Sequence, residues 1–409
     1  MSYETAKALD DTYVMHTFGR KPVEFVSGAG MHLQDDAGND YLDFLSGIGV
    51  CCLGHCHPAI VTAVQEQAAK LMHVSNYYQI EHRGEVAQQL SALLNNGDAD
   101  APELWKTFFA NSGAEANECA IKLARLYSKE KGHGGQGIIC MERSFHGRTL
   151  ATLAATRQPV KQAAFEPLPQ NFLSAKPNDI DSLKEAFAQH PNGIAAVMVE
   201  PVQGECGVYP LTAEYLQAAR ELAHENGALL ICDEVQCGIF RTGTPFAFQQ
   251  LGVVPDIVSM AKGIAGGFPM GACAARDEVA AVFVPGLHGS TFGGSNLAVA
   301  AADATLKTLQ DENIAENVKE VGAYFRAKLE SLDEVAEVRG MGLMLACELG
   351  EDVDAPKLVI DALYCGFVLN YTGPHTLRFL PPLVCTKEDV DALIAALPGL
   401  VAGAAGASN

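Results

Sequence analysis

Basic residues are scarce in this chain, and their scarcity excludes several classes of function. The 409 residues include 28 Lys and Arg against 49 Asp and Glu, a formal net charge of −21 at pH 7. Proteins that bind nucleic acid or an anionic membrane surface do so through a basic face. We therefore expect neither as a partner, and an anionic substrate would have to be held by a few local arginines. The acidic surplus by itself mainly favours solubility.

Targeting and membrane segments are missing from the sequence as well. Residues 1–5 do not begin a basic and then apolar secretory signal, and no uncharged apolar stretch reaches membrane-spanning length. Of the twelve cysteines, Cys140, Cys232, Cys273 and Cys347 lie inside apolar runs, which is typical of reduced core thiols. We expect a cytoplasmic protein.

A metal site is also not expected, although one segment suggests it. Cys51-Cys52-Leu53-Gly54-His55-Cys56-His57-Pro58 crowds its candidate ligands into a single turn. Zinc sites usually combine two separated ligand pairs, and no second pair follows downstream. A turn leading into a helix that begins at Pro58 explains the segment better.

The order of apolar runs predicts an α/β fold. Residues 31–34 and 41–45 flank a polar, Gly-containing stretch, which is a hairpin signal. From about residue 60 to 295, helical patterns alternate with short apolar strands, which is typical of a mostly parallel sheet covered on both faces. We expect residues 61–296 to form the large domain.

The C-terminal part has a different pattern. Helical stretches at 297–309 and 314–332 precede three shorter strand-like regions and a last helix near 387–397. We predict that residues 1–60 and 297–409 together form a smaller α/β domain from both chain ends.

Lys262 is the most informative residue. It ends the apolar run Ile257-Val258-Ser259-Met260-Ala261 and leads into glycines, and a buried ammonium is costly to desolvate. That position suits Schiff-base chemistry, which needs a lysine of lowered pKa. Asp233 ends another apolar strand, and a carboxylate that keeps a pyridine nitrogen protonated is what pyridoxal phosphate requires. A surface lysine would explain Lys262 alone, but not the two residues together.

Three further strands end in polar or Gly-containing turns. Ligands of open α/β sheets bind at the carboxyl ends of strands, so the five turns can meet in one crevice. The three turns are Asn111–Asn117, Ser144–Arg148 and Glu200-Pro201.

Several residues in these turns have two interpretations each. Ser112-Gly113-Ala114 opens a helix whose N-terminus could hold a phosphate, or Ser112 could be an ordinary N-cap. Phe145 could stack on a flat cofactor or pack in the core, and Arg148 could clamp a carboxylate or form a surface ion pair. His146 is ambiguous between ring contact and local hydrogen bonding. Gln236 could donate to a phenolic ring oxygen or be solvated.

Taken together, these motifs resemble the class III pyridoxal-phosphate-dependent aminotransferases, and within them most closely the acetylornithine aminotransferases. The resemblance covers nearly the whole chain and implies a fold-type I homodimer with two active sites at the subunit interface. The motifs are Asn111–Asn117, Phe145-His146-Gly147-Arg148-Thr149, Glu200-Pro201-Val202-Gln203-Gly204-Glu205, Asp233-Glu234-Val235-Gln236, Lys262-Gly263 and Gly289–Gly294.

The resemblance assigns the cofactor contacts. Lys262 binds the pyridoxal phosphate aldehyde and later moves the proton, and Asp233 pairs with the pyridinium nitrogen. Thr291 would reach the phosphate from the neighbouring subunit. The remaining cofactor-binding residues are expected to be Ser112, Gly113 and Ala114 at the phosphate, Phe145 on the ring, and Glu234, Val235 and Gln236 after the Asp233 strand.

The resemblance also assigns substrate contacts. Ser290 would contact substrate, and Arg148 would grip the α-carboxylate of the substrate or the distal carboxylate of 2-oxoglutarate. Glu200 and Arg378 are expected to be a switch pair, in which Glu200 neutralises Arg378 while the amine donor is bound; the alternative is a fixed ion pair. Two positions depart from the family pattern: Gly294-Ser295-Asn296 stands where an Asn-Pro is more usual, and Cys206 replaces a glycine.

The reaction that the resemblance implies is a ping-pong transamination in arginine biosynthesis. N2-acetyl-L-ornithine would give its δ-amine to 2-oxoglutarate, yielding N-acetyl-L-glutamate 5-semialdehyde and L-glutamate. Ornithine, succinylornithine or 4-aminobutyrate are alternative donors. A non-catalytic protein that only binds the cofactor is a further alternative, which Lys262, Asp233, Arg148 and Glu200 together argue against.

Overall fold

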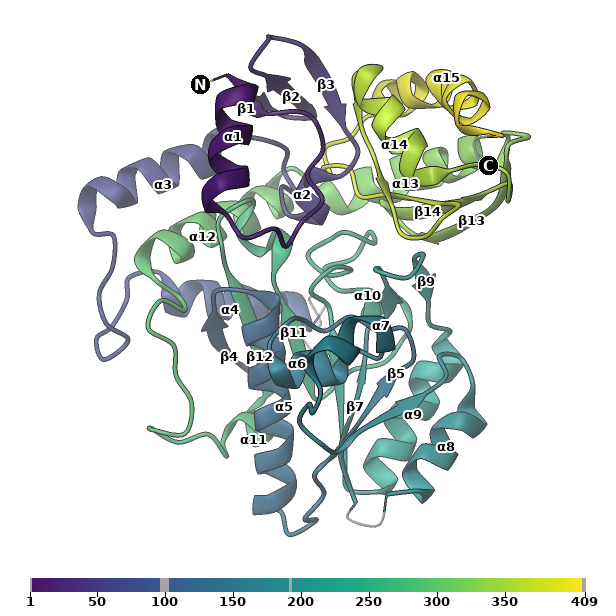
Figure 1. Cartoon of the computed structure of the whole chain (residues 1–409). Coiled ribbons are helices and arrows are strands. Elements are labelled where there is room, and N and C mark those ends of the chain that lie inside the picture. The colour runs from purple at the N-terminus through teal and green to yellow at the C-terminus, as the bar shows by residue number, and fades with distance from the viewer. Residues whose placement is uncertain (1, 96–102, 191–192, 407–409) are drawn as a thin grey trace.

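A seven-stranded sheet forms the centre of the computed structural model, which describes residues 2–95, 103–190 and 193–406 (Figure 1). The strand order is β4-β12-β11-β10-β7-β5-β6. Only β12 runs against its neighbours, so the predicted mostly parallel sheet is confirmed. The strands are β4 (Trp105–Ala110), β5 (Gly137–Met141), β6 (Phe172–Ala175), β7 (Ile194–Val199), β10 (Leu229–Asp233), β11 (Ile257–Met260) and β12 (Gly271–Arg276).

The central strands are almost entirely apolar because helices cover both faces of the sheet. Every residue of β5, β7, β10 and β11 is buried. Helix α5 (Gly113–Glu130) packs on this sheet through a stripe that includes Ala120, Leu123 and Ala124. The other elements between β5 and β12 are α6 (Leu150–Ala155), α7 (Pro159–Gln162), η1 (Ala163–Phe165), α8 (Ile180–Ala188), β8 (Val202–Gln203), β9 (Tyr209–Pro210), α9 (Ala213–Glu225), α10 (Ala247–Gln250) and η2 (Lys262–Ala265), with α11 (Asp277–Ala280) after β12.

The N-terminal part contains the predicted hairpin. Strands β2 (His32–Asp35) and β3 (Asp40–Asp43) pair antiparallel, and the Asp35 carboxylate closes their turn by accepting from the backbone N–H of Ala37 and Asn39. The same sheet contains β1 (Phe25–Ala29) and, from the far end of the sequence, β15 (Phe367–Val368), which runs parallel to β3. The helices of this part are α1 (Tyr3–Tyr13), α2 (Ser46–Gly49), α3 (Pro58–Lys70) and α4 (Arg83–Leu94).

The C-terminal part forms a separate antiparallel sheet, β13-β14-β17-β16, beside the hairpin (Figure 1). The last helix, α15 (Lys387–Ala404), extends past Pro398 and beyond the predicted end, because Leu400, Val401 and Ala404 continue its buried stripe. The elements are α12 (Asn296–Asp311), α13 (Ile314–Glu330), β13 (Val335–Met341), β14 (Met344–Leu349), α14 (Ala355–Tyr364), β16 (Asn370–Tyr371) and β17 (Thr376–Phe379). The division into three sequence segments stays a prediction, although β15 places the two chain ends in one sheet.

Within the described residues, none of the helices is long and apolar enough to cross a bilayer. The cytoplasmic location expected from the sequence stays a prediction.

Candidate active site

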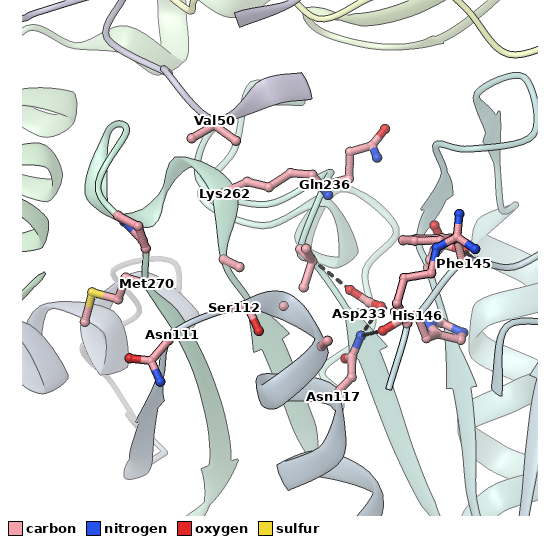
Figure 2. A pocket seen from close by; sticks show the side chains of 18 of the residues that line it. Val50, Asn111, Ser112, Asn117, Phe145, His146, Asp233, Gln236, Lys262 and Met270 are labelled. Carbon is pink, nitrogen blue, oxygen red and sulfur yellow. Dashed lines mark hydrogen bonds and ion pairs between the residues drawn. The ribbon is translucent and has the colours of Figure 1, made fainter. Parts of the chain in front are cut away.

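A cavity of about 400 Å³ lies at the carboxyl ends of β4, β5, β7, β10 and β11 (Figure 2). All five turns that the sequence singled out contribute to its lining, so the expectation that they meet is confirmed. The lining includes Asn111–Ala114 after β4, Phe145–Arg148 after β5, Glu200 after β7, Asp233, Val235 and Gln236 after β10, and Ala261 and Lys262 after β11.

Lys262 extends into this cavity from the first residue of η2 (Figure 2). Its backbone has a φ of 47°, a left-handed conformation that is unfavourable for residues other than glycine. Burial lowers its pKa, although the carboxylates of Glu205 and Asp233 oppose the shift. In the described part of the chain its amine has no ion-pair partner. The result is a poorly hydrated amine with nucleophilic character.

Asp233 is held in the cavity wall by three hydrogen bonds. Its Oδ2 accepts from Asn117 Nδ2 and from His146 Nδ1, both at 2.7 Å, and its Oδ1 accepts from the Val235 N–H at 3.0 Å. Burial opposes protonation of His146, but its hydrogen bond to Asp233 and the charge of that carboxylate raise its pKa. This hydrogen bond joins residues 87 apart in the sequence, so it is not the local bond considered for His146, and ring contact stays a prediction because His146 also lines the cavity. Its imidazolium form makes a buried ion pair with Asp233.

Asn117 is a site residue that sequence reasoning missed. It lies one turn into α5 from Gly113, and Ser259 Oγ donates to its side-chain oxygen at 2.5 Å, which orients its amide toward Asp233. The sequence did contain a signal for Asn117, because it is the last residue of the Asn111–Asn117 motif. The helical repeat places it on the same face of the helix as Gly113.

The N-terminus of α5 opens onto the cavity. The Ser112 side chain accepts from the Glu115 N–H at 3.2 Å, so Ser112 is the N-cap, and the earlier N–H groups at Gly113 and Ala114 have no intrahelical acceptor. A Cβ built on Gly113 would stand 2.7 Å from Val235 Cγ1, so any other residue here would have to displace the Val235 side chain. This arrangement suits an anion such as a phosphate.

Phe145 and Arg148 form the wall after β5. Phe145 is half-buried, and the guanidinium carbon of the exposed Arg148 lies 5.6 Å from the centre of its ring. Among the residues described, no carboxylate makes an ion pair with Arg148. Its charge is therefore available to an anionic ligand.

Glu200 does not pair with Arg378, and the predicted pair is wrong. Its Oε1 accepts from the Phe145 N–H at 2.8 Å and its Oε2 from the Gly204 N–H at 3.4 Å. The physical reason is its position at the end of β7, whose neighbour β5 leads directly into the Phe145 turn. Burial raises the pKa of Glu200, which favours the neutral acid.

Arg378 pairs instead with Glu205, from the loop between β8 and β9. Arg378 Nη1 donates to Glu205 Oε1 at 2.7 Å, and it also contacts the Gly204 carbonyl (3.1 Å) and Gln236 Oε1 (3.2 Å). Although burial opposes it, the guanidinium lowers the pKa of Glu205 to about 2. Neither member of this ion pair lines the cavity, and Gln236 lies between them and the open space.

Glu234 also faces away from the cavity, so its predicted cofactor contact is wrong. Side chains of consecutive residues in an extended chain point to opposite sides, and the Asp233 side chain points toward the cavity. The Glu234 carboxyl accepts from the backbone N–H of Ala247 (3.0 Å) and Phe248 (2.8 Å) and thereby caps α10. Burial raises its pKa to about 7.

Ser290 and Thr291 lie outside the Lys262 cavity of their own chain. They line a larger hollow of about 980 Å³, together with Asn76 and Arg83. The two sites are linked, since Asn111 Nδ2 donates to Ser290 Oγ at 3.2 Å. Their substrate and phosphate roles stay predictions.

The rest of the cavity wall is apolar and was not anticipated. Val50 comes from the segment after α2, and Phe268, Pro269 and Met270 come from the loop before β12. Val50 reaches the cavity only through the packing of the N-terminal part on the sheet (Figure 2), and no local pattern marks the residues of the loop before β12.

These features together test whether pyridoxal phosphate fits the cavity. An amine of lowered pKa, a carboxylate hydrogen-bonded to an imidazole, a free helix N-terminus and a half-buried aromatic ring match its aldehyde, pyridine nitrogen, phosphate and ring face. The glycine required at position 113 keeps the helix end open to the phosphate. The residues fit the group.

Comparison with known proteins agrees with this chemistry. The family model for class III aminotransferases matches residues 15–401. The chain is 46% identical over 402 residues to the acetylornithine aminotransferase of Methanocaldococcus jannaschii, covering 97% of this chain and 98% of that protein.

Two solved structures are similar in fold. The acetylornithine aminotransferase from Elizabethkingia anophelis superposes with a TM-score of 0.85 at 33% identity, covering 98% of this chain and 100% of that one. The ornithine aminotransferase from Toxoplasma gondii superposes with a TM-score of 0.91 at 31% identity, covering 98% and 95%. The latter structure was described with partial occupancy of pyridoxal phosphate at its active site.

Proposed function

The chain belongs to the class III aminotransferases, and on that premise we propose that it transfers the δ-amino group of N2-acetyl-L-ornithine to 2-oxoglutarate. The products would be N-acetyl-L-glutamate 5-semialdehyde and L-glutamate, a step of arginine biosynthesis. Transamination is supported above all by Lys262 and Asp233 meeting in one cavity. The choice of acetylornithine is supported by relatives of that name that match nearly the full chain.

The protein is a pyridoxal-phosphate-dependent enzyme, and its own residues have separable tasks. Pyridoxal phosphate, when bound, supplies an aldehyde that takes up amino groups and a ring that accepts electrons. We assign Lys262 Nζ to holding that aldehyde and to moving a proton at the reacting carbon. Asp233, fixed by Asn117 and His146, would keep the ring nitrogen protonated. Gly113 and Ala114 would bind the phosphate.

The two substrates present different ends to the reacting carbon. The donor brings an apolar methylene chain, whereas 2-oxoglutarate brings a carboxylate. We propose that Glu205 neutralises Arg378 while the donor is bound and releases it to the carboxylate of 2-oxoglutarate. Support comes from their 2.7 Å ion pair behind Gln236.

A panel of amine donors tests the substrate. Acetylornithine, ornithine, succinylornithine and 4-aminobutyrate are each incubated with 2-oxoglutarate, and glutamate is followed. We expect kcat/KM for acetylornithine to exceed that for ornithine by about tenfold or more, because one mismatched polar group costs about 1.4 kcal/mol or more. Ornithine is the second candidate, favoured by the likeness to the T. gondii enzyme. A higher value for ornithine would replace the proposal, and no glutamate from any donor would support a non-catalytic protein.

We also propose a homodimer with shared active sites. The support is that Ser290 and the exposed Thr291 lie beside a hollow of about 980 Å³ and outside the cavity of their own chain. Mixing Lys262→Ala chains with Thr291→Ala chains tests it. If Thr291 serves the other chain, mixed dimers contain one intact site and recover activity, whereas unrecovered activity would place Thr291 in its own chain's site.

A further inference from the structure

Asn370 directly faces Arg378 in the C-terminal sheet. Strand β16 pairs antiparallel with β17, and the register places Asn370 opposite Arg378, so the two side chains share one face. Asn370 Oδ1 accepts from Arg378 Nε at 3.1 Å and from Nη2 at 2.8 Å. On the other side of β17 the partner of Arg378 is Ala346, whose small side chain leaves room for the guanidinium.

Two edges of the guanidinium therefore bind different partners. A planar guanidinium can bind a carboxylate with two hydrogen bonds either through Nε and one Nη or through its two Nη atoms. Asn370 occupies the first edge. The second edge carries Nη1, which meets Glu205 Oε1, the Gly204 carbonyl and Gln236 Oε1. Among the described residues, Glu205 is the single carboxylate bonded to Arg378.

The chemical difference between the partners is charge. Arg378 is 2% exposed, so its charge must be balanced by a neighbour. The Asn370 amide is neutral: it fixes two N–H groups but leaves the charge for Glu205 or an incoming carboxylate to balance. A carboxylate at position 370 would balance it permanently.

We propose that Asn370 is a positioning residue that holds the Arg378 guanidinium in place without neutralising it, so that Glu205 and a substrate carboxylate compete for the Nη1 end. This inference rests on the proposed exchange at Arg378. Asn370 is the residue that allows Glu205 and the substrate carboxylate to alternate as the charged partner of Arg378. When Glu205 withdraws, Asn370, the Gly204 carbonyl and Gln236 still orient Arg378 for the carboxylate.

Binding of glutarate, an unreactive dicarboxylate, to the holoenzyme provides the test. For Asn370→Asp we expect the Kd for glutarate from calorimetry and the KM for 2-oxoglutarate to rise about tenfold or more, because the new carboxylate competes for the guanidinium. The KM for the amine donor should stay within about twofold. Asn370→Ala should weaken glutarate about fivefold to thirtyfold, because the guanidinium loses two hydrogen bonds. Asn226→Asp makes the same change at an exposed residue whose side-chain amide donates to the Leu222 carbonyl, and it is the matched control.

A rescue experiment separates positioning from a structural role. Glu205→Ala leaves Arg378 without a carboxylate and should slow the donor half-reaction. Adding Asn370→Asp should restore the rate of the donor half-reaction toward wild type while glutarate binding stays weak. If the role of Asn370 were purely structural, the second substitution would not restore that rate. Unchanged glutarate affinity in both Asn370→Asp and Asn370→Ala would overturn the proposal. So would a donor half-reaction that stays as slow in the double variant as in Glu205→Ala. Glutarate binding does not depend on which amine is the donor. The proposed donor and the proposed role of Asn370 can therefore be disproved independently of each other.

Discussion

Replacing Lys262 with alanine should reduce transamination by more than about 10²-fold, since proton transfer by a positioned group contributes about 10²–10⁴-fold and the covalent hold on the cofactor is lost as well. The physical basis is the amine inside the cavity, whose pKa burial lowers. Wild-type protein should be yellow, and borohydride should fix the cofactor to the peptide that contains Lys262. The alanine variant should still fold, because Lys262 makes no ion pair with another described residue.

The exposed Lys129 near the end of α5 offers a matched control. Lys129→Ala should retain activity, absorbance and borohydride labelling. Turnover by Lys262→Ala within tenfold of wild type, or labelling of a different lysine, would show that the central assignment is wrong.

The sequence predicted the framework of the site well because strand ends are encoded locally. Each of the five strands is a short, mainly apolar run, and each run ends in a polar or Gly-containing turn, so the shared edge of a parallel sheet brings Lys262 and Asp233 together. The antiparallel β12 escaped notice because its run Gly271–Arg276 is rich in small residues and lacks the β-branched side chains that mark a strand.

Errors arose where the partner of a side chain lies far away in the sequence. Local pattern could not decide whether Glu200 or Glu205 meets Arg378, since both acids lie in the same motif and the arginine is more than 170 residues away. Glu234 was misassigned because its neighbour Asp233 already takes the cavity side of β10. Asn370 gives no local signal, because its role depends on a register set by the pairing of β16 with β17.

The two acids should respond differently to mutation. Glu205→Ala removes the single described carboxylate that balances the buried Arg378, and an uncompensated buried charge costs about 3 to 5 kcal/mol. A dicarboxylate substrate relieves this cost when it binds, whereas acetylornithine, with a methylene chain at its reacting end, does not. We therefore expect the donor half-reaction to slow by about 10²-fold or more, and the glutamate half-reaction to be unchanged or faster, in single-turnover spectroscopy.

Glu200→Ala is the comparison variant for the Glu205→Ala experiment. Glu200 accepts from the Phe145 N–H, so its loss should loosen a wall of the cavity that both substrates use. Both half-reactions should therefore weaken by similar factors, and the cofactor should dissociate more readily. Equal losses of the two half-reactions in Glu205→Ala would mean that the Glu205–Arg378 pair is a fixed contact between the C-terminal sheet and the loop between β8 and β9. A selective loss in Glu200→Ala, with none in Glu205→Ala, would mean that the exchange at Arg378 does not depend on its ion pair with Glu205, and the proposed role of Glu205 would be wrong.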